Sequence, residues 1–121
     1  MTVTVKITKS FSSAAKPLLK KYRSLSKDLL NLEKELMVTP RLGTPLGQDV
    51  YKIRLKISSK GKGKSGGARV ISFVETTLIG VTEKVSDEEI TINLLTIYDK
   101  ADVENISDKE LKELIKSLKV K

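Results

Sequence analysis

The sequence contains no cysteine and no histidine among its 121 residues. Without cysteine the chain can form neither a disulfide nor a thiolate metal site. Without histidine it also lacks the commonest general base and the commonest metal ligand. Any catalysis must therefore use lysine, arginine, tyrosine, aspartate, glutamate, serine or threonine side chains.

Aromatic residues and long apolar runs are scarce as well. Phenylalanine, tryptophan and tyrosine make up only 4% of the chain, which argues against recognition of nucleic-acid bases by stacking alone. No apolar run approaches the 18 or so residues of a membrane-spanning helix, and the N-terminus lacks the apolar core of a signal peptide. We therefore expect a cytoplasmic protein with no membrane partner.

Positive charge is abundant and unevenly distributed. The chain has 23 lysines and arginines against 15 acids, a formal net charge of +8, which favours acidic partners such as nucleic acid. Residues 52–69 contain seven basic residues, and no acid occurs between Asp49 and Glu75. A second basic stretch precedes Asp28, the first acid of the chain. Dense positive charge on a strand–loop–strand frame is typical of a polyanion site, most often for a nucleic-acid backbone.

The first third of the sequence predicts one strand and two helices. Alternating apolar residues indicate a short strand at residues 3–7. A helix is expected over residues 14–22, beginning at Ser13 or later so that Pro17 falls near its first turn. A leucine stripe predicts a second helix over residues 25–36. Because only a few residues join the two helices, we expect them to pack as an antiparallel hairpin.

The rest of the sequence predicts strands and a final helix. Strands are expected at residues 50–57, 68–75 and 90–98. Loops are expected at residues 39–48 and 100–106. Residues 78–85 fit either a further strand or a helical turn. Ser107 and Glu110 form a capping box that opens a C-terminal helix. The prediction is a single α+β domain over residues 1–121, with a helical hairpin on a twisted antiparallel sheet of three to five strands.

Three basic residues on the predicted strands are candidates for the site. Lys52 and Arg54 share the polar face of one strand, where they are either ordinary solvent-facing residues or the floor of an RNA cleft. Arg69 alternates with apolar residues, so it either pairs with an acid or points into a site at the end of its strand. The acids available for such a pair are Glu75, Asp99 and Asp102.

The loop at residues 61–66 reads GKGKSG, which matches the GxGxxG dinucleotide fingerprint in letters only. That fingerprint requires a helix to follow, and here a strand is expected. We interpret the segment as a hairpin loop whose lysines close over a phosphate chain. The candidate nucleic-acid-binding residues around it are Lys56, Lys60, Lys62 and Lys64.

A group of acids follows the last predicted strand. Asp99, Asp102 and Glu104 have the residue types of a metal site, but no partner ligand lies near them in the sequence. We therefore interpret the group as a solvated turn, and expect neither a metal nor a cofactor.

Four segments of the chain are distinctive: SFSSAAKPLLKKY, LGTPLGQDVYKIRL, GKGKSGGARVISFV and LLTIYDKADVENIS. Together they resemble the RelE/ParE superfamily of bacterial toxins from type II toxin–antitoxin modules, and within it the HigB-like RelE branch. The likeness runs from about residue 5 to residue 118, and its last two segments are the more specific ones.

The resemblance implies a toxin that enters the ribosomal A site and cuts mRNA there, and a cognate antitoxin protein that blocks it. By position it implies catalytic roles for Lys52 and Arg54 before the glycine-containing loop, for Arg69 after that loop, and for Lys100 after the last strand. Such cleavage uses the RNA's own 2′-OH as nucleophile. It requires a base, an acid and charge stabilisation, and neither a metal nor a histidine.

The chain departs from the RelE pattern at two positions. Ala68 stands where an aromatic residue often precedes the loop arginine, and no tyrosine follows Tyr98 in the C-terminal segment. Two other functions stay open: a ParE-type DNA gyrase poison, which cleaves nothing, and a non-catalytic basic RNA-binding module. The cations at Lys52, Arg54 and Arg69 favour the nuclease, because a gyrase-binding protein has no need for convergent cations.

Overall fold

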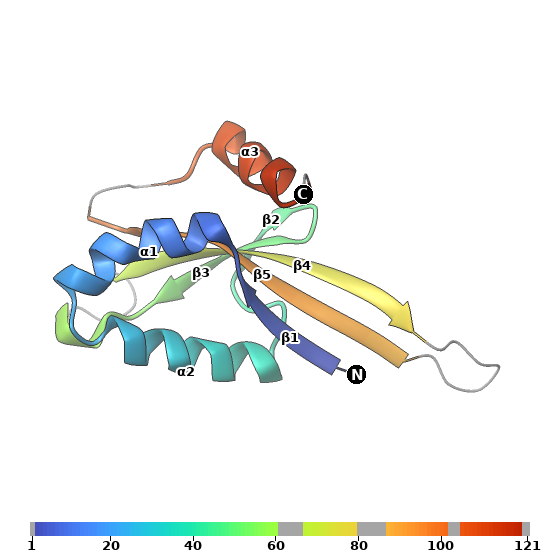
Figure 1. Ribbon diagram of the computed structural model, residues 1–121, viewed down its shortest axis with the longest axis horizontal. Helices are drawn as coiled ribbons and strands as arrows, with labels where there is room; N and C mark the ends of the chain where they lie inside the picture. Colours follow the sequence, from blue (N-terminus) through green and yellow to red (C-terminus); the bar gives the residue numbers. More distant parts are fainter. Residues whose placement is uncertain (1, 61–66, 80–86, 102–104, 120–121) are drawn as a thin grey trace.

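The structure is a computed structural model that describes residues 2–60, 67–79, 87–101 and 105–119. Within these ranges the chain forms an α+β fold with three α-helices and one five-stranded sheet (Figure 1). The elements in chain order are β1 (Thr2–Ile7), α1 (Lys9–Lys21), α2 (Leu25–Val38), β2 (Thr44–Gly47), β3 (Val50–Leu55), the 3₁₀-helix η1 (Ser58–Lys60), β4 (Ala68–Ile79), β5 (Asp87–Asp99) and α3 (Asp108–Lys119).

The sheet is mixed, so the prediction of a purely antiparallel sheet was wrong. Its strand order is β1-β5-β4-β3-β2. β1 runs parallel to β5, with Thr2 opposite Glu89 and Ile7 opposite Leu94, while the other neighbours are antiparallel. Alternating apolar residues identify a strand but not its partner. The pairing of β1 with a strand near the other end of the chain therefore left no local signal.

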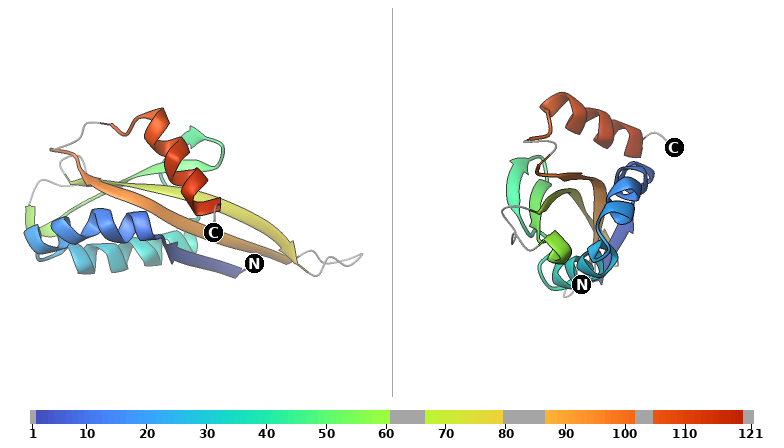
Figure 2. Two further views of the ribbon diagram at one scale, coloured as in Figure 1. Left: turned by 45° about the horizontal axis from the view of Figure 1, so that its top comes forward. Right: turned by 90° about the vertical axis from the view of Figure 1, so that its left-hand side faces the viewer.

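Helices cover both faces of the sheet. α1 and α2 lie on one face and α3 lies on the other (Figure 2). The larger core, under α1 and α2, includes Phe11, Leu25, Leu36, Ile53, Val70 and Ile92. The smaller core, under α3, is built on Val50, Ile71 and Leu95. The apolar residues of α3 are only partly buried, so α3 is the less deeply packed layer.

α1 begins earlier than the predicted residue 14, and Pro17 lies in its interior rather than near its first turn. The cap is Thr8, whose hydroxyl oxygen accepts a hydrogen bond from the Phe11 N–H at 3.2 Å. The same hydroxyl donates to the Leu94 carbonyl at 2.8 Å, so β5 fixes the start of the helix. Proline removes one helical hydrogen bond. Burial of the apolar face of α1 offsets that cost.

Most other predicted elements are confirmed with different bounds. α2, β3, β4, β5 and α3 lie where the periodicity places them, although β4 and β5 are longer than expected. The predicted loop at residues 39–48 contains the short edge strand β2. β4 continues through Ile79, and the rest of the undecided segment 78–85 lies outside the described residues. In the capping box, the Ser107 hydroxyl oxygen accepts from the Glu110 N–H at 3.2 Å.

Candidate nucleic-acid interface

Three strands bring polar side chains together in one row across the sheet. Arg54 on β3 lies opposite Arg69 on β4, and Arg69 lies opposite Tyr98 on β5. Residues directly opposite each other in antiparallel strands project from the same face. Lys52 projects from that face as well, because it lies two residues from Arg54 on the same strand. We call these four residues the cross-strand site.

The cross-strand site lies on the face of the sheet that α3 covers. Tyr98 packs in the smaller core together with Ile106 and the apolar residues of α3. Lys52 Nζ donates a hydrogen bond to Asn105 Oδ1 at 3.2 Å. The segment that leads into α3 is therefore attached to the site through one basic residue and packs against its tyrosine.

The cations of the cross-strand site differ in their access to solvent. Arg54 is exposed, and it makes no hydrogen bond or ion pair with residues that the structure describes. Lys52 is half-buried. Arg69 is only 5% exposed, and its Nη1 donates to the Ala68 carbonyl at 3.1 Å. A phosphate in solution would therefore meet Arg54 and Lys52 first, with the buried charge of Arg69 behind them.

Tyr98 completes the row with a buried hydroxyl. The Tyr98 oxygen is inaccessible to solvent and makes no hydrogen bond within the part of the chain that the structure describes. Burial raises the pKa of the Tyr98 phenol, while the backbone of Ile106 and the positive charge of Arg69 act in the opposite direction. The Tyr98 O–H is therefore a donor without an acceptor among the described residues, close to the positive charge of Arg69.

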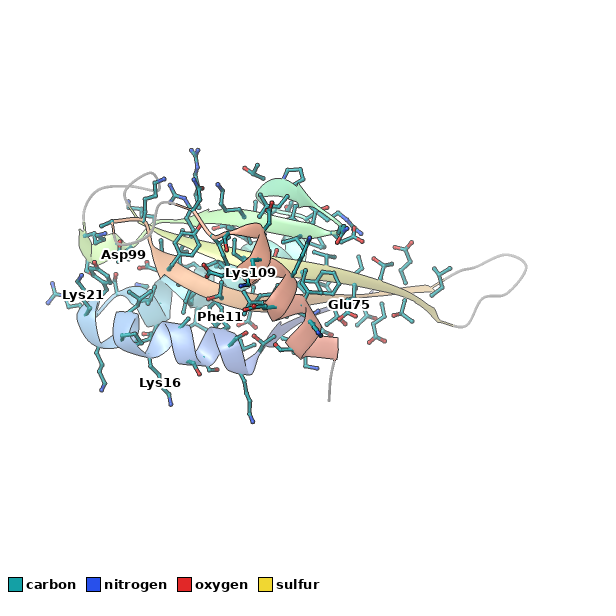
Figure 3. The ribbon with its side chains drawn as sticks, turned by 90° about the horizontal axis from the view of Figure 1, so that it is seen from above. Phe11, Lys16, Lys21, Glu75, Asp99 and Lys109 are labelled. Atoms are coloured by element: carbon teal, nitrogen blue, oxygen red, sulfur yellow. The ribbon has the colours of Figure 1, made fainter. Side chains whose placement is uncertain are left out.

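Lys60, predicted to bind a phosphate, belongs to a different cluster at the end of β5. Its ammonium lies 2.9 Å from Asp99 Oδ1 and 5.2 Å from the centre of the Tyr22 ring. The hydrogen bond to Asp99 raises the pKa of the Lys60 ammonium, against the opposing effect of burial. Lys21 approaches the same carboxylate at 4.0 Å, and Figure 3 shows Lys21 and Asp99 at the same end of the molecule.

Asp99 is buried, so its interpretation as part of a solvated turn was wrong. It is 2% exposed and accepts hydrogen bonds from the Tyr22 hydroxyl and the Ala101 N–H. Burial by itself raises the pKa of the carboxyl. The hydrogen bonds from Tyr22, Ala101 and Lys60 outweigh that effect and lower the pKa of Asp99 to about 2. The carboxylate therefore joins the end of α1, η1 and the end of β5.

A second buried carboxylate fixes η1 from the other side. Asp28 on α2 is 6% exposed and accepts hydrogen bonds from the Ser58 N–H at 3.0 Å, the Ser58 hydroxyl at 2.7 Å and the Ser24 hydroxyl at 2.8 Å. All three donors are neutral. Because Asp28 holds Ser58 and Asp99 holds Lys60, both ends of η1 are fixed immediately before residue 61.

Two other predicted site residues, Lys56 and Lys100, lie within the described ranges. Lys56 is exposed and lines a hollow between β3 and α2, together with Arg54 and Glu35. The N–H of Lys100 donates to the Gly67 carbonyl at 3.1 Å, and the Lys100 side chain is half-buried. Lys62 and Lys64 lie outside the described residues. A strand, β4, follows the glycine-rich segment, so the requirement of the dinucleotide fingerprint for a helix is not met.

Sequence reasoning missed the residues that act across long separations. Tyr22 and Asp99 lie 77 positions apart, so no local pattern connects them. Glu75, a suggested partner for Arg69, instead accepts a hydrogen bond from Asn93 Nδ2 at 2.7 Å. The one available signal for Asp99 was its position at the end of an apolar strand, where a charged residue is either solvated or paired.

The site offers cations and one phenol, which suits binding of phosphate oxygens and stabilisation of a phosphate's developing charge. Among the described residues no group of three acids is placed to hold a metal ion. No helix in the described ranges is long and apolar enough to cross a bilayer. No protein-family model matches the chain, and no solved structure matches it significantly.

Proposed function

We propose that this protein is a RelE-like toxin of a type II toxin–antitoxin module, a cytoplasmic endoribonuclease that cuts mRNA on the ribosome and is blocked by a cognate antitoxin. The observation that carries the proposal is the cross-strand site. Lys52, Arg54 and Arg69 come from two strands and converge on one face of the sheet, in a stretch of sequence without acids. Convergent cations with no acid nearby in the sequence suit a polyanionic substrate.

The proposed reaction is an intramolecular transesterification. The 2′-oxygen of one ribose forms a bond to the adjacent phosphorus, the bond from phosphorus to the 5′-oxygen breaks, and the products are a 2′,3′-cyclic phosphate and a 5′-OH. A base takes the 2′-OH proton and an acid supplies a proton to the leaving 5′-oxygen. The ribosome supplies the in-line arrangement of these atoms, which replaces much of the positioning that an isolated enzyme must provide.

The three cations of the cross-strand site, together with Lys100, have roles in this proposal. Arg54, which is exposed, contacts the phosphate oxygens. Lys52 exchanges its hydrogen bond with Asn105 for one to the substrate and serves in proton transfer. Arg69 contributes its charge to the pentacoordinate phosphate from behind the other two. Lys100, at the end of β5, adds positive potential at that end of the sheet.

A non-catalytic RNA-binding module is the second candidate, and one observation favours it. Arg69 is 5% exposed, and the Tyr98 hydroxyl is inaccessible to solvent. Of the four residues of the cross-strand site, only Lys52 and Arg54 then reach a ligand, which is enough for phosphate binding but not for a complete acid–base set. The module would bind RNA with steep salt dependence and form no product.

Pulse labelling in cells separates these functions. Cells that express the wild-type protein should stop incorporating labelled amino acids while labelled thymidine incorporation continues. The double variant Lys52→Gln, Arg54→Gln should leave translation unaffected, whereas Lys34→Gln, which changes an exposed lysine of α2, should behave as wild type. Arrest of DNA synthesis instead would favour a gyrase poison. Unchanged translation and growth with the wild-type protein would overturn the toxin proposal and leave the binding module.

A further inference from the structure

α1 carries a lysine stripe on the side opposite its buried face. The helix rotates about 100° per residue, which places Lys9, Lys16 and Lys20 within roughly 40° of one another around its axis. Phe11, Ala15 and Leu18, which are buried, lie on the other side. Figure 3 shows Lys16 pointing away from the sheet. We call Lys9, Lys16 and Lys20 the α1 lysine ridge.

The charge of the α1 lysine ridge is not balanced by acids. α1 has four lysines and no acid among its 13 residues. The three ridge lysines are exposed and form no ion pair with residues in the described ranges. The first acid of the chain, Asp28, is turned inward to Ser24 and Ser58. Positive charge therefore accumulates along α1, and no described acid forms an ion pair with the three ridge lysines.

The position of Lys9 works against helix stability. It lies in the first turn of α1, where the helix dipole disfavours a cation, and no acid occupies that turn. The exposed lysines of α3 are a contrast. That helix also has four lysines, but three acids accompany them and two of those acids lie in its first turn. The acids in the first turn of α3 stabilise that helix through its dipole. Lys9 does not stabilise α1 in this way, but it can bind an external anion.

The C-terminal end of the ridge lies at the same end of the sheet as the cross-strand site, although α1 and the site lie on opposite faces of the sheet. Tyr22, directly after α1, bonds to Asp99, which follows Tyr98 on β5. The C-terminal end of α1 and the end of the sheet that carries Arg69 therefore meet, as Figure 1 shows. The axial distance from Lys9 to Lys20 is about 16 Å, since a helix rises about 1.5 Å per residue. A ridge of that length can contact several successive phosphates of one strand.

We propose that the α1 lysine ridge is a second RNA-binding surface, which holds a phosphate backbone outside the cross-strand site. The identity of the anion as RNA rests on the proposed function, but the ridge does not depend on cleavage. The ridge contacts backbone phosphates, so it adds affinity without sequence preference. In the toxin it would anchor the protein on one stretch of RNA backbone while the cross-strand site engages the strand to be cut.

The test is the salt dependence of RNA affinity, measured by fluorescence anisotropy with a labelled 20-nucleotide single-stranded RNA. The variant Lys9→Gln, Lys16→Gln, Lys20→Gln should lower the magnitude of the slope of log K against log salt by about 2, since each phosphate contact contributes about 0.7 on single strands. A fourfold rise in salt would then weaken the variant about 16-fold less than the wild type. Glutamine has a helix propensity close to that of lysine, and circular dichroism checks that α1 is retained.

The matched control changes the same number of charges on α3. The variant Lys109→Gln, Lys112→Gln, Lys116→Gln should change the slope by less than about 0.5. Equal slope changes in the two triple variants would mean that only net charge matters, and would overturn the proposal. The proposal would also fail if the ridge variant lost affinity for polyglutamate but kept its RNA slope, because the partner would then be an acidic protein.

A separate readout distinguishes this inference from the proposed function. If the ridge variant keeps the wild-type RNA slope while Lys52→Gln, Arg54→Gln abolishes translation arrest, the ridge proposal fails and the toxin proposal stands. If the ridge variant loses slope but the wild-type protein arrests nothing, the ridge is an RNA-binding surface of a protein that is not a toxin.

Discussion

The substitution Asp99→Asn should destabilise the protein in a pH-dependent way. The pKa of Asp99 falls from 3.8 to about 2 in the folded protein, and each unit corresponds to about 1.36 kcal/mol. Ionised Asp99 therefore contributes about 2 kcal/mol at pH 7 that asparagine cannot supply. For a domain of this size such a loss lowers Tm by roughly 8 °C.

The stabilisation that Asp99 contributes should depend on pH. Because the pKa is lower in the folded state, the contribution is complete above pH 4 and is lost as the pH falls toward 2. The difference in unfolding free energy between wild type and Asp99→Asn should shrink from about 2 kcal/mol at pH 7 to about half that value at pH 3. Urea denaturation at several pH values measures both quantities.

A double-mutant cycle with Tyr22→Phe tests whether the hydrogen bonds to Asp99 cause this stabilisation. Tyr22→Phe removes one hydrogen bond to the carboxylate, so it should cost about 1–2 kcal/mol alone and less in the Asp99→Asn background. A difference between wild type and Asp99→Asn below 0.5 kcal/mol at pH 7, or one that does not change with pH, would refute the account of this cluster.

Three further changes test other parts of the frame by urea denaturation. Asp28→Ala leaves the three donors from Ser24 and Ser58 without their acceptor and should cost about 2–3 kcal/mol, whereas an unchanged midpoint would contradict the role of Asp28. Gly43→Ala should cost about 1–3 kcal/mol, because φ is 108° and a Cβ would lie 2.5 Å from the Lys52 carbonyl oxygen; wild-type stability would show that the turn can relax. Pro17→Ala restores a donor inside α1 and should stabilise the protein by about 1 kcal/mol or more, and a loss of stability would contradict that.

Local patterns in the sequence predicted the elements of the fold better than their partners. The leucine stripe of α2 and the alternation around Ile53 are properties of a few neighbouring residues, and both are confirmed. The parallel pairing of β1 with β5 and the capping of α1 by Thr8, which bonds to Leu94, depend on contacts more than 80 residues apart. No window of sequence contains those contacts.

For the candidate site, too, the sequence predicted local features but not the contacts between distant residues. The alternation that places Lys52 and Arg54 on one face follows from strand geometry. The same alternation points both side chains away from the larger core, which contains Ile53 and Leu55. The strand register that places Arg69 opposite Arg54 and Tyr98 is a tertiary property. The ion pair between Lys60 and Asp99 is also a tertiary contact. A count of basic residues in the sequence therefore could not show that Lys60 has a structural role while other lysines face a ligand.

The most direct test of the central claim is primer extension on an mRNA in a purified translation system, with wild type, Arg54→Gln and Lys34→Gln compared. The account predicts discrete cuts within codons that require ribosomes and are equally strong with Lys34→Gln. It predicts cuts about 10- to 100-fold weaker with Arg54→Gln, which loses a charged contact to phosphate. Absence of cuts with the wild-type protein, or full cutting by Arg54→Gln, would contradict it.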